Sequence, residues 1–149
     1  MRIDRLLQGA LGAAALIAAG AVTAQLPTIV LTAGMHLIRA EVAADFDTRA
    51  RGLMFRKSLA PNQGMLFVFD ESGRQCMWMK NTFIPLSVAF IDADGTIANI
   101  ADMKPHDETS HCAVRNVPYA LEMEQGWFSS RGLKAGTRLA GIDKAPSPR

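Results

Sequence analysis

The fold class is decided by residues 86–100, which read LSVAFIDADGTIANI. Leu86 to Ile91 is apolar and partly β-branched, which predicts a strand. Asp92 to Gly95 is a turn signature, and Gly95 can adopt the positive φ that a tight hairpin turn needs. Ile97 to Ile100 then returns as a second apolar segment. The stretch therefore predicts an antiparallel β-hairpin.

Similar short segments surround this hairpin on both sides. Period-two alternation or short apolar runs predict further strands, with turn residues between most of them, at 28–32, 35–42, 65–69, 75–79, 119–124 and 138–140. Residues 102–117 are polar and predict a long surface loop. Seven or eight short strands with two short helices favour a mainly-β domain, either a β-sandwich or barrel-like, with an α+β fold as the alternative.

The first short helix is predicted to begin at Asp45, whose side chain can cap it. Phe46, Ala50 and Leu53 would share one face, and Arg49 and Arg51 would turn outward. The second helical turn is expected between Gly126 and Gly132.

The N-terminus has the pattern of a secretory signal. Arg2 and Arg5 precede an Ala- and Leu-rich stretch, and Val22-Thr23-Ala24 places small residues before Gln25. We expect cleavage after Ala24, export to the bacterial periplasm and no membrane span afterwards. The alternative is an uncleaved N-terminal anchor, because the apolar stretch approaches the length of a membrane span. The organisation is then a signal (1–24), one globular domain (25–142) and a flexible tail (143–149).

The charge balance excludes one class of partner. The chain has 16 Lys and Arg residues against 14 Asp and Glu residues, a net charge of +2, with no basic stripe. Nucleic-acid binding is therefore not expected.

The chain has two cysteines, Cys76 and Cys112, and both lie in the predicted exported part. In an oxidising compartment such a pair predicts one disulfide. There are two alternatives. One is a metal site formed by Cys112 with His106 and His111, and the other is two separate thiols. Met77 and Met79 share a face if the segment is extended, and they are either core residues or copper ligands. We expect no cofactor and no metal as the simplest outcome.

Several short motifs occur in a fixed order along the chain, and together they resemble domain-of-unknown-function family 192. They are Gly52-Leu53-Met54-Phe55-Arg56, Gly64-Met65-Leu66-Phe67-Val68-Phe69, Trp78-Met79-Lys80-Asn81-Thr82, Ile84-Pro85-Leu86, Ala120-Leu121-Glu122, Gly126 and Gly132-Leu133. The resemblance spans about 35–141 and implies a compact, mainly-β and often exported domain. The family has no established activity, so no catalytic residue is carried over. Many members have Asp where Ser87 stands here.

The segment Trp78-Met79-Lys80-Asn81-Thr82 has the highest density of chemically useful groups. Trp78 offers a stacking surface, while Lys80 and Asn81 offer donors to an anionic or hydroxylated ligand. Arg56 can add a bidentate clamp, and Glu122 can orient Lys80 or act as a base. The alternative is structural: Trp78 packs in the core, Asn81 caps a turn, and Lys80 pairs with Glu122.

No catalytic constellation is recognisable, so the preferred function is an exported binding or accessory domain with its ligand groove near residues 78–82. The first alternative is a cell-envelope hydrolase or transferase that uses Glu122 and Lys80. The second is copper handling through Met77, Met79 and the histidine loop. The oligomeric state does not follow from the sequence.

Overall fold

The computed structural model describes residues 25–149, so the predicted signal at 1–24 lies outside the described residues. The elements in chain order are β1 (Thr28–Ala33), β2 (His36–Ala43), α1 (Phe46–Arg51), β3 (Gln63–Gly73), β4 (Cys76–Met77), β5 (Leu86–Ile91), β6 (Ile97–Met103), β7 (His111–Cys112), β8 (Val117–Glu124), and the 3-10 turns η1 (Ser129–Arg131) and η2 (Ile142–Lys144). The prediction of a mainly-β fold is confirmed.

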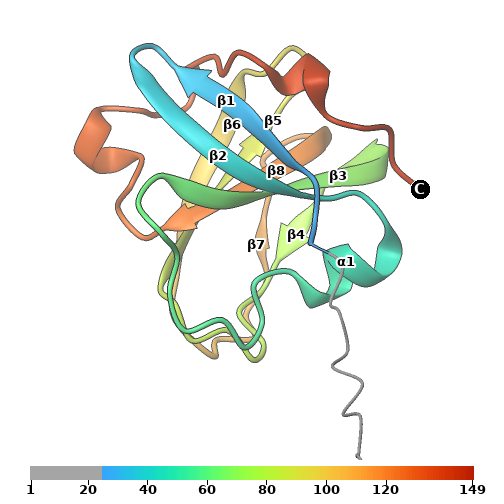
Figure 1. The fold of residues 1–149 in the computed structure, drawn as a ribbon, viewed down its shortest axis with the longest axis vertical. Helices are drawn as coiled ribbons and strands as arrows, with labels where there is room; N and C mark the ends of the chain where they lie inside the picture. Colours follow the sequence, from blue (N-terminus) through green and yellow to red (C-terminus); the bar gives the residue numbers. More distant parts are fainter. Residues whose placement is uncertain (1–24) are drawn as a thin grey trace, which may run out of the picture.

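Six strands form one curved sheet in the order β1-β2-β3-β8-β5-β6, and β4 pairs with β7 in a separate ribbon (Figure 1). Only the β2–β3 pair in the sheet is parallel. The hairpin predicted from residues 86–100 is the β5–β6 pair, in which Leu86 faces Met103. The predicted strand 138–140 makes two isolated bridges, from Ala140 to Thr32 and from Arg138 to Thr96. The sheet is not a closed barrel.

The sheet buries side chains on both of its faces. On β3, Leu66 and Val68 join one core cluster, while Met65 and Phe67 join the other. This alternation is the period-two geometry of a strand. The first cluster is covered by residues near the C-terminus, including Trp127, and the second by loop residues such as Leu53, Met79 and Ile84. Both faces of the central strands are therefore buried from solvent.

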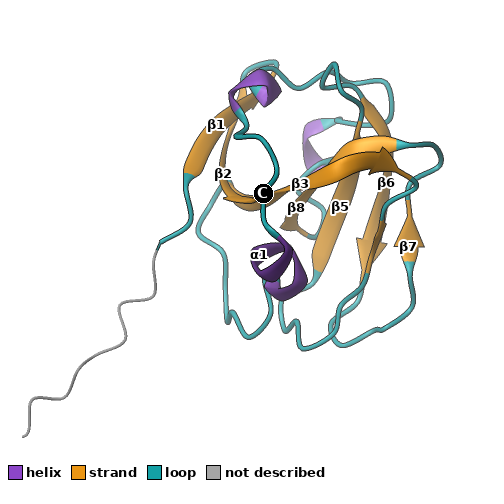
Figure 2. Ribbon diagram, turned by 90° about the vertical axis from the view of Figure 1, so that its right-hand side faces the viewer, coloured by secondary structure: helices purple, strands orange, loops and turns teal. Residues whose placement is uncertain are grey.

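Helix α1 begins as predicted, because the Asp45 carboxylate accepts a hydrogen bond from the Thr48 N–H at 2.9 Å. The predicted orientation is right only in part: Leu53 is buried and Arg51 is exposed, but Phe46 is 75% exposed and no residue of the helix itself is buried. Arg49 turns inward instead and donates to the carbonyl oxygens of Ala44 and Val68 at 2.9 and 3.0 Å. These two carbonyls satisfy the guanidinium, so the helix is attached to the sheet through Arg49 rather than through an apolar face. Figure 2 shows α1 beside the central strands.

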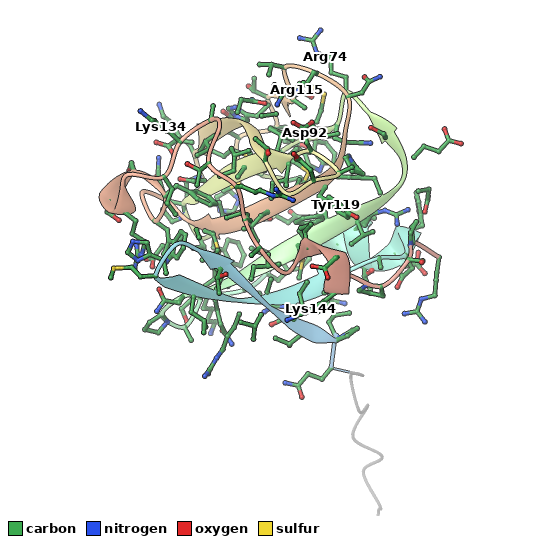
Figure 3. All side chains as sticks on the ribbon, turned by 90° about the horizontal axis from the view of Figure 1, so that it is seen from above. Arg74, Asp92, Arg115, Tyr119, Lys134 and Lys144 are labelled. Atoms are coloured by element: carbon green, nitrogen blue, oxygen red, sulfur yellow. A yellow bond between two sulfur atoms is a disulfide. The ribbon has the colours of Figure 1, made fainter. Side chains whose placement is uncertain are left out.

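The disulfide joins Cys76 of β4 to Cys112 of β7, which face one another in the ribbon. The predicted loop at 102–117 therefore contains one short paired strand, and its first residues extend β6. Outside the ribbon, Arg115 and Asp92 form an ion pair at the turn of the β5–β6 hairpin (Figure 3). In the described part of the chain, no helix is long and apolar enough to cross a membrane.

The tail predicted at 143–149 follows Ile142, and its first residues complete η2. The backbone N–H of Arg149 donates to the Ala44 carbonyl at 2.7 Å. The flexibility of this tail stays a prediction.

Candidate functional site

The Trp78–Thr82 segment leaves β4 and turns sharply before β5. Asn81 has a left-handed backbone with φ of 52°, and its carbonyl accepts a hydrogen bond from the Phe55 N–H at 2.9 Å. The Thr82 hydroxyl donates to the Lys80 carbonyl at 3.0 Å. Asparagine tolerates this conformation better than most residues, so Asn81 suits this turn. That its side chain caps the turn stays a prediction.

Trp78 does not pack in the core, as that same alternative expected, because the residue is 45% exposed. The Lys80 Nζ lies 5.2 Å from the centroid of the Trp78 ring. This distance is within the range of a cation–π contact. Trp78 and Lys80 therefore form one surface unit, with an aromatic face and a cation side by side.

A small cavity of about 30 Å³ lies beneath this segment. Its walls come from the end of α1, from the loop after it, from β3 and β4, and from β8. The lining residues are Arg49, Ala50, Arg51, Gly52, Leu53, Met54, Phe67, Met77, Trp78, Thr82 and Glu122. The volume is enough for one water molecule or one hydroxyl group.

Glu122 supplies the only carboxyl group among these lining residues. It lies in the middle of β8, with Met65 of β3 on one side and Val88 of β5 on the other. Both neighbours are fully buried, and Glu122 itself is only 3% exposed. Loss of water around the carboxyl disfavours its charged form, and this desolvation raises the pKa of Glu122 to about 8 from the ordinary 4.5. At neutral pH the group is therefore mostly protonated.

No cation neutralises this carboxyl. Within residues 25–149 the ion pairs join Arg49 to Asp70, Arg56 to Glu41 and Arg115 to Asp92, so the Lys80–Glu122 pair of the structural alternative does not form. Arg49 borders the cavity, but its guanidinium is engaged by two carbonyls and by Asp70. Arg51 also borders the cavity; it is exposed to solvent and takes part in none of these ion pairs. Glu122 is thus a buried acid held neutral by its surroundings.

Arg56 lies apart from the cavity. Its guanidinium binds the Glu41 carboxylate through two hydrogen bonds, of 2.8 and 2.5 Å, and this pairing raises the pKa of Arg56. Both residues line a broader open groove of about 760 Å³ beside α1. A ligand at Arg56 would have to compete with Glu41.

The structure brings Trp78 and Glu122 to one cavity, places Lys80 against Trp78, and leaves Arg56 in the neighbouring groove. Ligand binding by these four residues and Asn81 stays a prediction. Sequence reasoning missed Met54 and Thr82 as lining residues, although both belong to motifs that carry the family resemblance. Their place in motifs that occur in a fixed order along the chain was the available signal.

Copper handling through Met77, Met79 and the histidine loop stays a prediction. Met79 is completely buried in the core, and Met77 lines the cavity. Among the described residues there is no group of three or more His, Cys, Asp or Glu side chains that could hold a metal ion.

A comparison with known protein families shows to which family this chain belongs. The model of the family DUF192, described as "Uncharacterized ACR", matches residues 29–141. The chain belongs to domain-of-unknown-function family 192. The match confirms the resemblance inferred from the ordered motifs. No curated protein matches the chain.

Two solved structures of relatives resemble this domain. A Sinorhizobium meliloti protein named "putative transcription regulator" is 37% identical, with a TM-score of 0.72 over 77% of this chain and 94% of its own. A Novosphingobium aromaticivorans protein of unknown function is 32% identical, with a TM-score of 0.72 over 88% of this chain and 99% of its own. Solved structures of relatives from two different bacteria thus share this architecture.

Proposed function

We propose that this family 192 domain is an exported binding module for a small hydroxylated ligand. One ligand hydroxyl enters the cavity and bonds to the Glu122 carboxyl, while the body of the ligand lies against Trp78 and Lys80. The observation that carries the proposal is a buried, neutral carboxyl that lines a cavity of one-hydroxyl size.

A structural role alone does not account for Glu122. A carboxyl buried among apolar side chains without a cation costs stability, and an apolar residue would fill the same place on β8 at lower cost. Strongly shifted pKa values of this kind occur most often at functional sites.

The protonation state of Glu122 favours a hydroxylated ligand over an anionic one inside the cavity. A protonated carboxyl can both donate and accept, which matches a hydroxyl group. Of the two cations in the lining, the Arg49 guanidinium is already bound and Arg51 is exposed to solvent. An anionic group on the same ligand would instead lie outside, within reach of Lys80.

The disulfide supports export, because disulfides persist mainly in oxidising compartments. The regulator name of the S. meliloti relative would suggest nucleic-acid binding. The net charge of +2 and the six-residue length of α1, the longest helix of the described residues, argue against that role here.

Ligand-observed NMR with glycerol, glucose and N-acetylglucosamine as probes tests the proposal. We expect at least one probe to bind the wild-type protein. Glu122→Leu should weaken that binding by about tenfold or more, because a buried hydrogen bond is lost, and Lys80→Ala should also weaken it. Glu124→Gln is the matched control, since Glu124 is exposed on the same strand. Binding that is unchanged in Glu122→Leu, or no binding of any probe, would overturn the proposal.

The raised pKa of Glu122 also favours a second candidate, a cell-envelope hydrolase or transferase with Glu122 as the general acid. A pKa close to the working pH is the optimum for such a group. Glycoside hydrolysis usually needs a second carboxyl, and the cavity lining contains none. Turnover of a glycan or ester substrate that is lost in Glu122→Gln would favour this candidate over simple binding.

A further inference from the structure

Three loops meet at one end of the molecule, at the bottom of Figure 1. They are the segments 52–59, 78–85 and 104–110, which we call the tip loops. Backbone hydrogen bonds tie them together: the Phe55 N–H donates to Asn81, the His106 N–H donates to Thr82, and the Met79 N–H donates to Asp107. The tip loops therefore form one connected surface.

Each tip loop contains a non-glycine residue with a left-handed backbone. Phe55, Asn81 and His106 have φ values of 64°, 52° and 63°. Such a conformation is costly for Phe in particular. Strain of this kind persists where the surrounding structure enforces it, and it concentrates at functional sites.

The left-handed turns accompany exposed aromatic side chains. Phe55 is 56% exposed and Phe83 is 45% exposed. Their ring centroids lie 6.2 Å apart, and the Phe83 and His106 rings lie 5.1 Å apart. Two exposed Phe rings in contact form an apolar patch, which on a soluble domain marks an interaction surface.

The chain enters the described domain beside this patch. Gln25 and Leu26 line the same groove as Phe55 and Arg56. In the sequence, the apolar stretch from Leu6 to Ala21 ends just before them. The N-terminal segment is therefore joined to the domain beside the groove that Phe55 lines.

Each of the three tip loops also contains a lysine. Lys57, Lys80 and Lys104 are exposed, whereas Arg56 is neutralised by Glu41. The acidic residues of the tip loops are Asp107, whose carboxylate accepts from the Thr109 N–H, and the exposed Glu108. Exposed lysines on the same loops as exposed Phe rings match a bilayer surface with anionic headgroups.

We propose that the tip loops dock on the surface of an anionic lipid bilayer, with Phe55 and Phe83 in the interfacial region and the lysines on the headgroups. In the docked orientation, the Trp78 side of the domain faces the membrane. This inference does not depend on what binds at Glu122.

Hydrogen–deuterium exchange of the full chain, mixed with vesicles, tests the proposal whether or not the N-terminus is cleaved. Phosphatidylglycerol–phosphatidylcholine vesicles should slow exchange in the tip loops severalfold, and phosphatidylcholine vesicles should slow it less. The double variant Phe55→Ser and Phe83→Ser should lose this protection, with vesicle affinity reduced by about tenfold or more.

The matched control is Met35→Ser with Leu37→Ser. These exposed apolar residues lie at the β1–β2 turn, at the opposite end of the molecule (Figure 1), and the control should keep wild-type protection. Exchange that is unchanged by anionic vesicles, or protection at the β1–β2 turn instead of the tip loops, would overturn the proposal.

Discussion

Glu122 shows how a single position links the sheet to the site. The alternation of residues 119–124 places Glu122 and Glu124 on the same face of β8, yet Glu124 is exposed and Glu122 is buried. The difference comes from the layer above that face, where the end of α1 and the Trp78–Thr82 segment cover Glu122. The sequence alternation predicted the strand, but no local pattern showed that distant segments would remove water from this carboxyl.

Because the folded pKa of Glu122 is about 8 and the unfolded pKa is 4.5, the stability of the protein should depend on pH. The protonated form contributes its full stability below pH 4.5, and that stability is lost as pH rises towards 8. Within this window the free energy of unfolding should fall by up to about 1.4 kcal/mol per pH unit from this group. Glu122→Gln, which mimics the neutral acid, should remove that dependence and exceed the wild-type stability at the alkaline end.

Urea unfolding of both proteins across this pH range measures the effect, with Glu124→Gln as the control for the loss of one carboxyl. Parallel pH dependences for wild type and Glu122→Gln would show that the carboxyl is solvated.

At the scale of elements, the β4–β7 ribbon is the smallest paired unit and lies next to the site. It has two residue pairs, Cys76 with Cys112 and Met77 with His111, and Met77 lines the cavity. The disulfide closes a loop over a sequence separation of 36. By chain-entropy reasoning, such a crosslink stabilises the fold by about 4 kcal/mol.

The double variant Cys76→Ser and Cys112→Ser should therefore unfold at a clearly lower urea concentration than the oxidised wild type. Reduced wild-type protein should behave like the variant, which separates the loss of the crosslink from the effect of the serine hydroxyls. Equal midpoints for oxidised and reduced wild type would contradict the account.

Helix α1 marks the limit of prediction at this scale. The Asp45 cap is a local signal, and the sequence predicted it correctly. The inward turn of Arg49 was not predicted, because the Val68 carbonyl that it binds lies on β3 and becomes available only after β3 has packed beside the helix. In a helix of six residues, two partly buried hydrogen bonds from the guanidinium and its pairing with Asp70 outweigh an apolar face that contains only Phe46 and Ala50.

For the whole molecule, the strands, the hairpin at residues 86–100 and the disulfide were predictable, because each depends on local pattern or on cysteine count. The sheet order was not, since β8 inserts between β3 and β5, which precede it in the chain. That insertion puts Glu122 between Met65 and Val88. The site residues Trp78 and Glu122 were chosen for their chemistry, but the cavity that joins them follows only from the topology.

The measurement that most directly tests the central claim is a pH titration of the Glu122 side-chain carboxyl carbon by ¹³C NMR, assigned with the Glu122→Gln variant. The account predicts a midpoint of about 8, well separated from the surface carboxylates. A midpoint near the ordinary value of 4.5 would mean that Glu122 is ionised and solvated at neutral pH, and the neutral acid on which the proposed site depends would not exist.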